Sequence, residues 1–479
     1  MKNKLLLILI LIIFVQAKTF AIDIIYPKIN GAKVYANSTF FVGNCDSNNN
    51  LYINSQQVEV LENGSFVKYV PLNMGRNTFF FEEKNKTSGE LINSLDFKIN
   101  RLEPPQNCIG EDNNLTCTDK IYFATIKQDN VPIRNGANEN AQRISHLDVN
   151  TILFLDGRQN DFWRVILDEN KHAWVQKKHI TEPVEIESKI VTKIDEITFV
   201  SDSESYNFMY KLKFPVPFVI EEQENDLILK LYNVDTSDYD KTIGKNYIIE
   251  PLEKNILQTH FKRNELLWGY DVTYKNGVLN FKINKQPKIN KNTPLKGIKI
   301  MIDAGHGGRD CGAVGPTRVK ESEINLDVAL KLRKILEKQG AIVSMTREKD
   351  VFVDLYDRIK LAKKENPVFL ISLHANALPD GGNPEIRHGT SVFYYYPQAK
   401  KFAHTMQKNM LEKMGTKDDG IIRRSFVLTR NSSSLSILIE MAYMVHPKEY
   451  TLLLNDNFRQ VIAESIKNGL EQYLIENVK

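Results

Sequence analysis

The chain has 479 residues, of which 42% are hydrophobic and 25% are charged, as is ordinary for soluble, folded protein. This length is too great for one core, so about three or four domains are expected. The formal charge is +4 and falls to +1 if residues 1–21, which carry three lysines and no acidic residue, are removed. A near-neutral protein has no general electrostatic reason to bind nucleic acid or anionic lipid.

Residues 1–21 have the pattern of a secretory signal peptide. Lys2 and Lys4 precede an apolar run from Leu5 to Val15, and small residues around Ala21 suit a signal peptidase. Eleven apolar residues fall short of the roughly 20 that span a bilayer, which disfavours a membrane anchor. We therefore expect an exported protein, in the periplasm, on the cell surface or outside the cell.

Four cysteines, Cys45, Cys108, Cys117 and Cys311, allow disulfides in an exported chain. Cys108 and Cys117 flank a short polar stretch that a disulfide between them would close into a loop. Three pairings are available, and the sequence does not choose among them.

Residues 22–103 alternate short β-type runs with turn signals such as Asn30-Gly31 and Asn63-Gly64. This spacing predicts a small β-sandwich-like domain. The following segment, 104–119, is rich in polar residues and is predicted to be a linker.

Residues 120–183 resemble a bacterial SH3-like domain. The resemblance rests on the runs 130–136, 162–165 and 172–175, and it implies a module that binds cell-wall peptide. The alternative is that Trp163 and Trp174 are ordinary core aromatics. The histidines of this region, His146, His172 and His179, lack partners at metal-ligand spacing.

Residues 186–285 are again strand-rich, with expected strands at 189–191, 208–212, 227–232 and 278–283. Residues 214–218 weakly resemble the β-rich domains that precede some wall amidases. We predict an all-β accessory domain here, followed by a linker over 286–294.

From residue 295 to 479, strand-like runs alternate with amphipathic helices, which predicts an α/β domain with a mixed sheet flanked by helices. Its clearest helix has an apolar stripe at Ile324, Val328, Leu332 and Leu336, with Gly340 as a stop. The expected strands are 299–302, 342–345, 368–373, 392–396 and 435–439, and the other expected helices are 355–364, 399–414 and 458–474.

Two histidines and one carboxylate in this domain are candidate metal ligands. His306 sits in a glycine-rich turn after strand 299–302, Glu321 comes just before the next helix, and His374 follows strand 368–373. Ligand sites in open α/β sheets lie beyond the carboxyl ends of the strands. Two imidazoles and a carboxylate suit a catalytic zinc that keeps its fourth position for water. We therefore predict a Zn²⁺ site.

Glu440 closes the apolar strand 435–439. Because an isolated buried charge is costly, this carboxylate must be paired, capped or functional. At the same edge of the sheet as the metal, it can serve as the general base that zinc hydrolysis needs.

Residues 298–475 resemble the zinc-dependent N-acetylmuramoyl-L-alanine amidases of bacterial cell walls. Five segments carry the resemblance in the family's order: 303–308 (DAGHGG), 321–326 (ESEINL), 346–347 (TR), 372–376 (SLHAN) and 438–440 (LIE). The resemblance implies that His306, Glu321 and His374 hold Zn²⁺, that Glu440 is the catalytic acid/base, and that peptidoglycan is the substrate. Glu323 rivals Glu321, but the family's ligand precedes the first apolar residue of the helix, as Glu321 does.

Two features depart from the family's pattern. Cys311 stands in the loop after His306, where the family usually lacks a thiol; it is either a further zinc ligand or an unpaired loop cysteine. Some division-associated relatives carry a long helical insert after the 372–376 segment that covers the zinc, whereas here only a short loop, 378–388, follows. We predict an open site. Glu385, Arg387 and His388 in this loop either line the substrate groove or are solvated.

Three functions fit these observations: an amidase whose β domains bind the wall, a wall-binding scaffold with an inactive hydrolase domain, and a zinc peptidase that cuts another wall amide. All four functional positions are filled, which disfavours the second. Only the family resemblance disfavours the third, since the same ligands serve many hydrolases. We expect a monomer, and the sequence identifies no activating partner.

Overall fold

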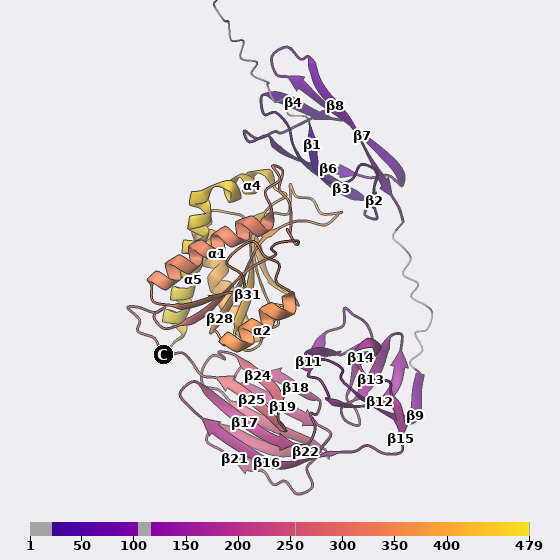
Figure 1. Cartoon of the computed structure of the whole chain (residues 1–479), viewed down its shortest axis with the longest axis vertical. Coiled ribbons are helices and arrows are strands. Elements are labelled where there is room, and N and C mark those ends of the chain that lie inside the picture. Colours follow the sequence, from indigo (N-terminus) through magenta and orange to yellow (C-terminus); the bar gives the residue numbers. More distant parts are fainter. Residues whose placement is uncertain (1–21, 104–115, 254, 479) are drawn as a thin grey trace, which may run out of the picture.

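The computed structural model describes residues 22–103, 116–253 and 255–478. It has a long β-rich part followed by a C-terminal α/β domain (Figure 1). The predicted signal peptide, Cys108 and most of the predicted linker 104–119 lie outside the described residues. In the part of the chain that is described, no helix is both long and apolar enough to span a membrane.

Residues 22–103, here called the first β domain, form two sheets around one apolar core that includes Phe41, Phe66 and Phe81. The first sheet has the order β1 (Asp23–Tyr26), β3 (Ser38–Asn44), β6 (Ser65–Pro71). The second has the order β2 (Ala32–Val34), β8 (Leu91–Arg101), β7 (Gly75–Asn85), β4 (Asn49–Ile53), β5 (Gln56–Val58).

Three further sheets follow. One has the order β11 (Arg143–Leu147), β10 (Val131–Arg134), β14 (His172–Gln176), β13 (Phe162–Ile166), β12 (Ile152–Gln159), β9 (Thr116–Thr125), β15 (Val184–Ile186). The next has the order β20 (Val234–Asp235), β16 (Thr192–Ser201), β17 (Ser205–Leu212), β25 (Val278–Asn284), β24 (Tyr270–Lys275). The last has the order β18 (Phe218–Glu222), β19 (Asp226–Tyr232), β23 (Ile256–Lys262), β22 (Tyr247–Glu253), β21 (Thr242–Ile243).

The α/β domain is built on a six-stranded sheet in the order β27 (Ile342–Met345), β26 (Lys299–Ala304), β28 (Phe369–Asn376), β31 (Leu435–Tyr443), β29 (Thr390–Tyr394), β30 (Asp418–Arg423). The sheet is mixed, as predicted, because β29 runs antiparallel to β31 while the other neighbours are parallel. The carboxyl ends of β26, β28 and β31 therefore meet at one edge.

Helices cover both faces of this sheet. Helices α1 (Glu321–Lys338), α3 (Lys400–Met414) and α5 (Asp456–Asn477) share one core with the side chains of Ile300 and Ile302. Helix α2 (Leu355–Glu365) packs on the other face, against Met301. Successive side chains of β26 are thus buried on opposite faces of the sheet. This explains why the sequence of the strand is a continuous apolar run. A short helix, α4 (Pro447–Leu454), follows β31.

The structure corrects several expected elements. Strand β31 continues to Tyr443, so Glu440 lies inside the strand instead of closing it, and Glu321 is the first residue of α1 instead of preceding it. Residues 189–191 are not a strand; β16 begins at Thr192. Strand β30 and helix α4 were not predicted, because each is short and has a weak apolar pattern.

A buried ion pair fixes the carboxyl end of β26. The guanidinium of Arg358 lies 2.6 Å from the carboxylate of Asp303, and their side chains are only 3% and 1% exposed. Asp303 also accepts hydrogen bonds from the hydroxyls of Thr346 and Ser372. Burial alone would raise the pKa of Asp303, but Arg358 and these hydroxyls hold it below its usual range. One charged group therefore ties β26, β28 and α2 together.

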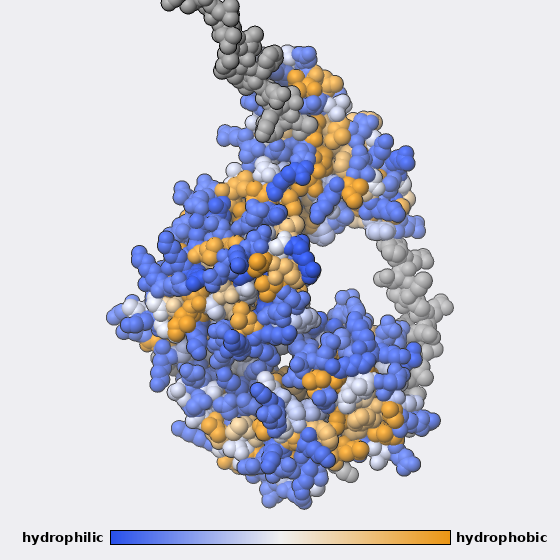
Figure 2. Space-filling view, viewed as in Figure 1, coloured by the Kyte–Doolittle hydropathy of each residue, from blue (hydrophilic) through white to orange (hydrophobic). Residues whose placement is uncertain are grey.

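The first β domain packs against the same edge of the α/β sheet (Figures 1 and 2). Phe40 and Val42 of β3 share a buried apolar cluster with Leu378, Tyr443 and Val445. The carboxylate of Asp380 accepts hydrogen bonds from the hydroxyls of Tyr26 and Thr39, and the amide of Gly381 donates to the carbonyl of Ser38 at 3.1 Å. The loop between β28 and β29, residues 377–389, is thus held from outside by this domain.

Replacing Arg358 with Met should lower the free energy of unfolding of the α/β domain by about 3–5 kcal/mol, because Asp303 would keep a buried charge without its partner. Adding Asp303→Asn should recover part of that loss. The control is Arg333→Met, which breaks solvent-accessible pairs with Glu337 and Glu348 and should cost less than about 1 kcal/mol. Urea denaturation of the three variants measures the difference. Equal losses in Arg358→Met and Arg333→Met would contradict this account.

Candidate active site

His306 lies in a tight turn at the end of β26. Its φ of 60° is in the left-handed region, and Gly307 and Gly308 follow with φ of 129° and 58°. A non-glycine residue in this region stores strain unless its surroundings hold it there. Two buried guanidiniums do so: Arg347 donates to the carbonyls of Ala304 and Gly305, and Arg358 donates to the carbonyl of His306 itself.

Glu321 is the buried carboxylate of the group. Its Oε2 accepts a hydrogen bond from the amide of Ala313 at 2.8 Å. Its Oε1 accepts from the amide of Ala375 at 3.2 Å and from the side chain of Asn325, one turn along α1, at 3.2 Å. Its rival Glu323 is exposed, on the other side of the helix. Only Glu321 therefore faces the sheet edge.

The two imidazoles converge on Glu321. Its Oε1 lies 3.2 Å from Nε2 of His306 and 3.0 Å from Nδ1 of His374. The two rings have centroids 4.9 Å apart and planes at 80°. One nitrogen or oxygen of each residue lies within 4.8 Å of the others, so the three predicted ligands, 68 residues apart in sequence from first to last, form one cluster.

Two glycines leave room for this cluster. A Cβ atom on Gly305 would lie 2.3 Å from the ring of His374, and one on Gly312 would lie 2.4 Å from Oε2 of Glu321. Both contacts are shorter than real Cβ atoms allow, so any larger residue would displace a ligand side chain. The glycine-rich sequence around His306 is therefore required by the site as well as by the turn.

The charges in the cluster shift the pKa values of its members. Burial lowers the pKa of His306, but hydrogen bonds and ion pairs with Glu321 and Asp310 outweigh this effect and raise it to about 9. Burial opposes ionisation of Glu321, but the two imidazoles hold its pKa well below its usual range. Without a cation, Glu321 and His306 thus stabilise each other's charged forms.

Glu440 lies beside the cluster. It is in register with His374 across the parallel strands β28 and β31. Its Oε2 is buried and has no hydrogen-bond partner among the described residues. Burial raises its pKa well above the usual range, and the negative charges of Glu321 and Asp419 raise it further. An unpartnered buried oxygen next to a second carboxylate is a position that a cation, or a water bound to one, would stabilise.

The donor set fits zinc. Ligands about 2.0–2.1 Å from a tetrahedral zinc ion are separated by roughly 3.3 Å, close to the separations of 3.0 and 3.2 Å between the carboxylate oxygen and the two ring nitrogens. Asp310 lies 2.9 Å from the other nitrogen of His306, an arrangement that fixes the orientation of a metal-binding imidazole. Cys311 is a free thiol whose Sγ donates to the carbonyl of Gly312, and it is not part of the converging group.

A second group, His388, His446 and Glu449, also brings two imidazoles and a carboxylate within 4.8 Å. Its geometry differs. The rings are stacked, with centroids 4.1 Å apart and planes at 6°, so no point lies in the plane of both rings along their lone pairs. Nδ1 of His388 lies 2.7 Å from Oε1 of Glu449, and Oε2 of Glu449 accepts from the amide of Tyr443. We assign this group to hydrogen bonding and not to metal binding.

The other loop residues have separate environments. Arg387 lies 3.7 Å from Asp419, which also accepts a hydrogen bond from the hydroxyl of Tyr443. Glu385 lines a cavity between the α/β domain and the first β domain. The loop 377–389 contains no helix. Sequence reasoning missed Asp310, Asn325 and Asp419; the first two stand four positions after His306 and Glu321, a spacing that could have identified them as their partners.

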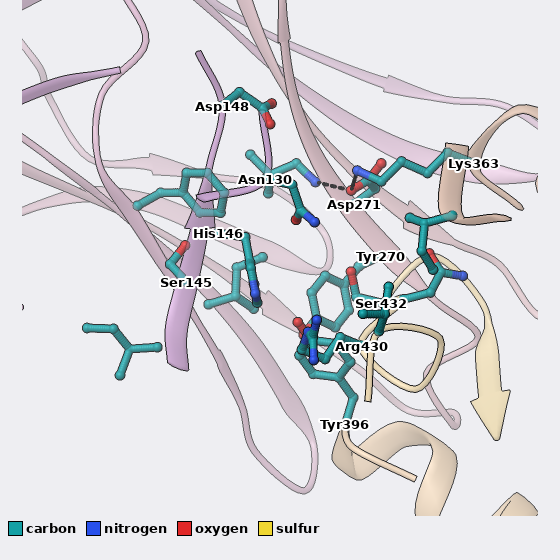
Figure 3. A pocket seen from close by; sticks show the side chains of 17 residues that line it. Asn130, Ser145, His146, Asp148, Tyr270, Asp271, Lys363, Tyr396, Arg430 and Ser432 are labelled. Atoms are coloured by element: carbon teal, nitrogen blue, oxygen red, sulfur yellow. Dashed lines mark hydrogen bonds and ion pairs between the residues drawn. The ribbon is translucent and has the colours of Figure 1, made fainter. Parts of the chain in front are cut away.

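A separate cavity of about 100 Å³ lies where three parts of the chain meet (Figure 3). Its labelled side chains include His146 on β11, Tyr270 on β24, Lys363 on α2, Tyr396 after β29 and Arg430 before β31. Lys363 pairs with Asp271 across it. None of the predicted zinc ligands lines this cavity. The segment before β31, which does line it, is at the opposite end of that strand from the site. We therefore regard the cavity as part of the junction between domains.

The raised pKa of Glu440 predicts a pH-dependent stability of the metal-free protein. A folded state that binds the proton more tightly than the unfolded state loses stability as pH rises above the unfolded pKa of about 4.3. Glu440→Gln removes that loss, so the variant should match the parent near pH 4 and exceed it increasingly toward pH 7. Urea denaturation with a chelator present measures this trend, with the exposed Glu323→Gln as the control. A constant difference between Glu440→Gln and the parent across this range would rule the explanation out.

Comparison with known proteins identifies the family. A family model described as N-acetylmuramoyl-L-alanine amidase matches residues 300–472. The germination-specific N-acetylmuramoyl-L-alanine amidase of Bacillus subtilis is 34% identical over 202 residues, 38% of this chain and 82% of that protein. The probable cell wall amidase LytH of Staphylococcus epidermidis is 34% identical over 182 residues, 38% of this chain and 60% of that protein.

Solved structures of similar sequence are also known. The catalytic domain of CwlV, an N-acetylmuramoyl-L-alanine amidase of Bacillus (Paenibacillus) polymyxa var. colistinus, is 34% identical and covers 37% of this chain and 98% of that chain, with a TM-score of 0.35. The chain spans 60% of the length of the first curated relatives it matches. The family match and the identity to the B. subtilis protein show that this chain belongs to the N-acetylmuramoyl-L-alanine amidase family.

Proposed function

We propose that the chain is an exported, zinc-dependent hydrolase that cleaves the amide bond between N-acetylmuramic acid and L-alanine in peptidoglycan. The observation that carries the proposal is the convergence of His306, Glu321 and His374 at one sheet edge, beside the half-buried Glu440. Membership of the amidase family supports the substrate. The names of its relatives, which include cell wall amidases, support an exported or cell-wall location.

In this proposal His306, Glu321 and His374 hold the ion and Glu440 handles the proton. A bound zinc would lower the pKa of its water to about 7 and polarise the scissile carbonyl. Glu440 accepts the proton of the attacking water and then donates it to the departing alanine nitrogen. In the metal-free protein, burial and the charges of Glu321 and Asp419 raise the pKa of Glu440, and a base of higher pKa takes a proton more readily.

The supporting residues orient these groups. Asp310 fixes the ring of His306, and Asn325 and the amide of Ala375 fix the carboxylate of Glu321. The upstream β domains are proposed to bind or target the wall, the SH3-like resemblance of residues 120–183 being the support for this. The domain boundaries at 22–103, 120–183, 186–285 and 295–479, and the monomeric state, remain predictions.

Peptidoglycan digestion separates the three candidate functions. An amidase should release stem peptides with a free L-alanine amino terminus, because the bond to the lactyl group is the one cut. An inactive scaffold should release nothing, and a peptidase should leave shortened peptides on the sugar. Mass spectrometry of soluble fragments from purified walls, with and without a chelator, gives the answer. Release that is unaffected by the chelator would contradict metal dependence.

Variants separate metal binding from proton transfer. Glu440→Gln should keep the zinc content and the fold while lowering turnover by about 10²-fold or more, since general acid–base groups contribute about 10²–10⁴-fold. His306→Ala and His374→Ala should lower the zinc content itself. Elemental analysis alongside activity distinguishes the two effects, and His404→Ala, an exposed histidine of α3, is the control. Substantial activity in Glu440→Gln would refute its role.

A further inference from the structure

A cavity of about 330 Å³ lies between the first β domain and the α/β domain. Residues 57–59, 61, 67 and 68 line it from one side, and Glu385 with residues 446–448 line it from the other. This volume is within the range of about 300–1,000 Å³ that small-ligand sites occupy. Two domains that are far apart in sequence thus build one concave surface.

The charges around this cavity are only partly neutralised. Glu59 and Lys448 form an exposed ion pair across the domains at 3.6 Å. Lys68 of β6 and Glu385 of the loop 377–389 line the same cavity, and neither has an ion-pair partner among the described residues. The cavity therefore offers one free ammonium and one free carboxylate. Val58, Leu61 and Pro447, which also line the cavity, supply apolar surface.

The cavity is at the same end of the sheet as the zinc ligands. His446, which lines it, follows β31 three residues after its end and stacks on His388. Both histidines contact Glu449, which also accepts a hydrogen bond from the amide of Tyr443, the register partner of Asn376 two positions after His374. Two hydrogen bonds through Glu449 therefore link His446 of the cavity to β31, the strand next to the one that carries His374.

The first β domain is fixed in this position by contacts of several kinds. Besides the buried cluster around Phe40 and the bonds to Asp380, the guanidinium of Arg318 makes two hydrogen bonds with Asp23, at 2.8 and 2.9 Å. Asn63 donates to the hydroxyl of Thr451 on α4 at 2.9 Å. An apolar cluster combined with hydrogen bonds between the two domains is expected for a stable interface.

We propose that this cavity binds the stem peptide of the substrate, so that the first β domain is part of the substrate site. The inference rests on the proposed function and deepens it by assigning the part of the substrate that lies beyond the scissile amide. The ligand is a short peptide that carries both carboxylates and an ammonium group. Lys68 pairs with a carboxylate of the peptide, Glu385 pairs with its ammonium group, and alanine methyl groups contact the apolar surface.

Two substrates with the same scissile bond test the proposal on the full chain. The long one is N-acetylmuramyl-L-Ala-γ-D-Glu-diaminopimelate, and the short one is N-acetylmuramyl-L-alanine. The measured quantity is the ratio of kcat/KM for the long over the short substrate. Lys68→Gln and Glu385→Gln should each lower this ratio by about two- to fivefold, as expected for the loss of one partly exposed charge contact, and Lys68→Arg should retain most of it.

Lys98→Gln is the matched control, because it removes the same charge from an exposed position of the same domain, outside the cavity. It should leave the ratio unchanged. A ratio that Lys68→Gln and Glu385→Gln do not alter would overturn the proposal. So would an equal loss on both substrates together with a lower Tm, which would reveal a structural role only.

Failure of the proposed function gives a different result. If the parent protein cleaves neither substrate, the amidase assignment fails, and calorimetric titration of the free tripeptide L-Ala-γ-D-Glu-diaminopimelate into the full chain then tests the cavity alone. Binding that Lys68→Gln weakens and Lys98→Gln does not would support the peptide site. Absence of binding, or binding insensitive to Lys68→Gln, would overturn it.

Discussion

One carboxylate oxygen, Oε1 of Glu321, organises the whole site. It lies within 3.2 Å of a ring nitrogen from each of two histidines, one in the turn after β26 and one on β28. It can do so because α1 begins at Glu321, whose carboxylate lies 3.2 Å from the imidazole of His306. Four donors around a single buried oxygen leave it little freedom, so the separation of the two imidazoles is set before any ion arrives. This preorganisation reduces the entropic cost of binding a metal.

The glycine-rich turn depends on two charged side chains that donate hydrogen bonds to its backbone. Arg347 and Arg358 together donate hydrogen bonds to the carbonyls of residues 304, 305 and 306, and Asp303 balances one of the two charges. A guanidinium suits this task because its planar array of donors can serve several acceptors at once. The backbone of the turn is therefore held by side chains that are not themselves predicted ligands.

Much of the α/β domain could be predicted from the sequence because its apolar pattern is strong. The stripe from Ile324 to Leu336 became the buried face of α1, and β27 has the predicted bounds. The end of β31 could not be found in this way, because Met441, Ala442 and Tyr443 continue an apolar run that Glu440 interrupts. The candidate ligands came from the rule that strand ends meet at one edge, and the structure brings them together there. No sequence pattern predicted the stacked pair of His388 and His446, because only the tertiary fold brings these residues side by side.

The packing of the first β domain has a consequence for dissecting this protein into fragments. Leu378, Tyr443 and Val445 are covered by Phe40 and Val42, so a fragment that starts at residue 295 would present those three apolar side chains to water. An uncovered hydrophobic patch favours self-association. The α/β domain of this chain thus carries a surface adapted to a neighbour in the same polypeptide, and its behaviour in isolation would differ from that of a relative in which this surface is polar.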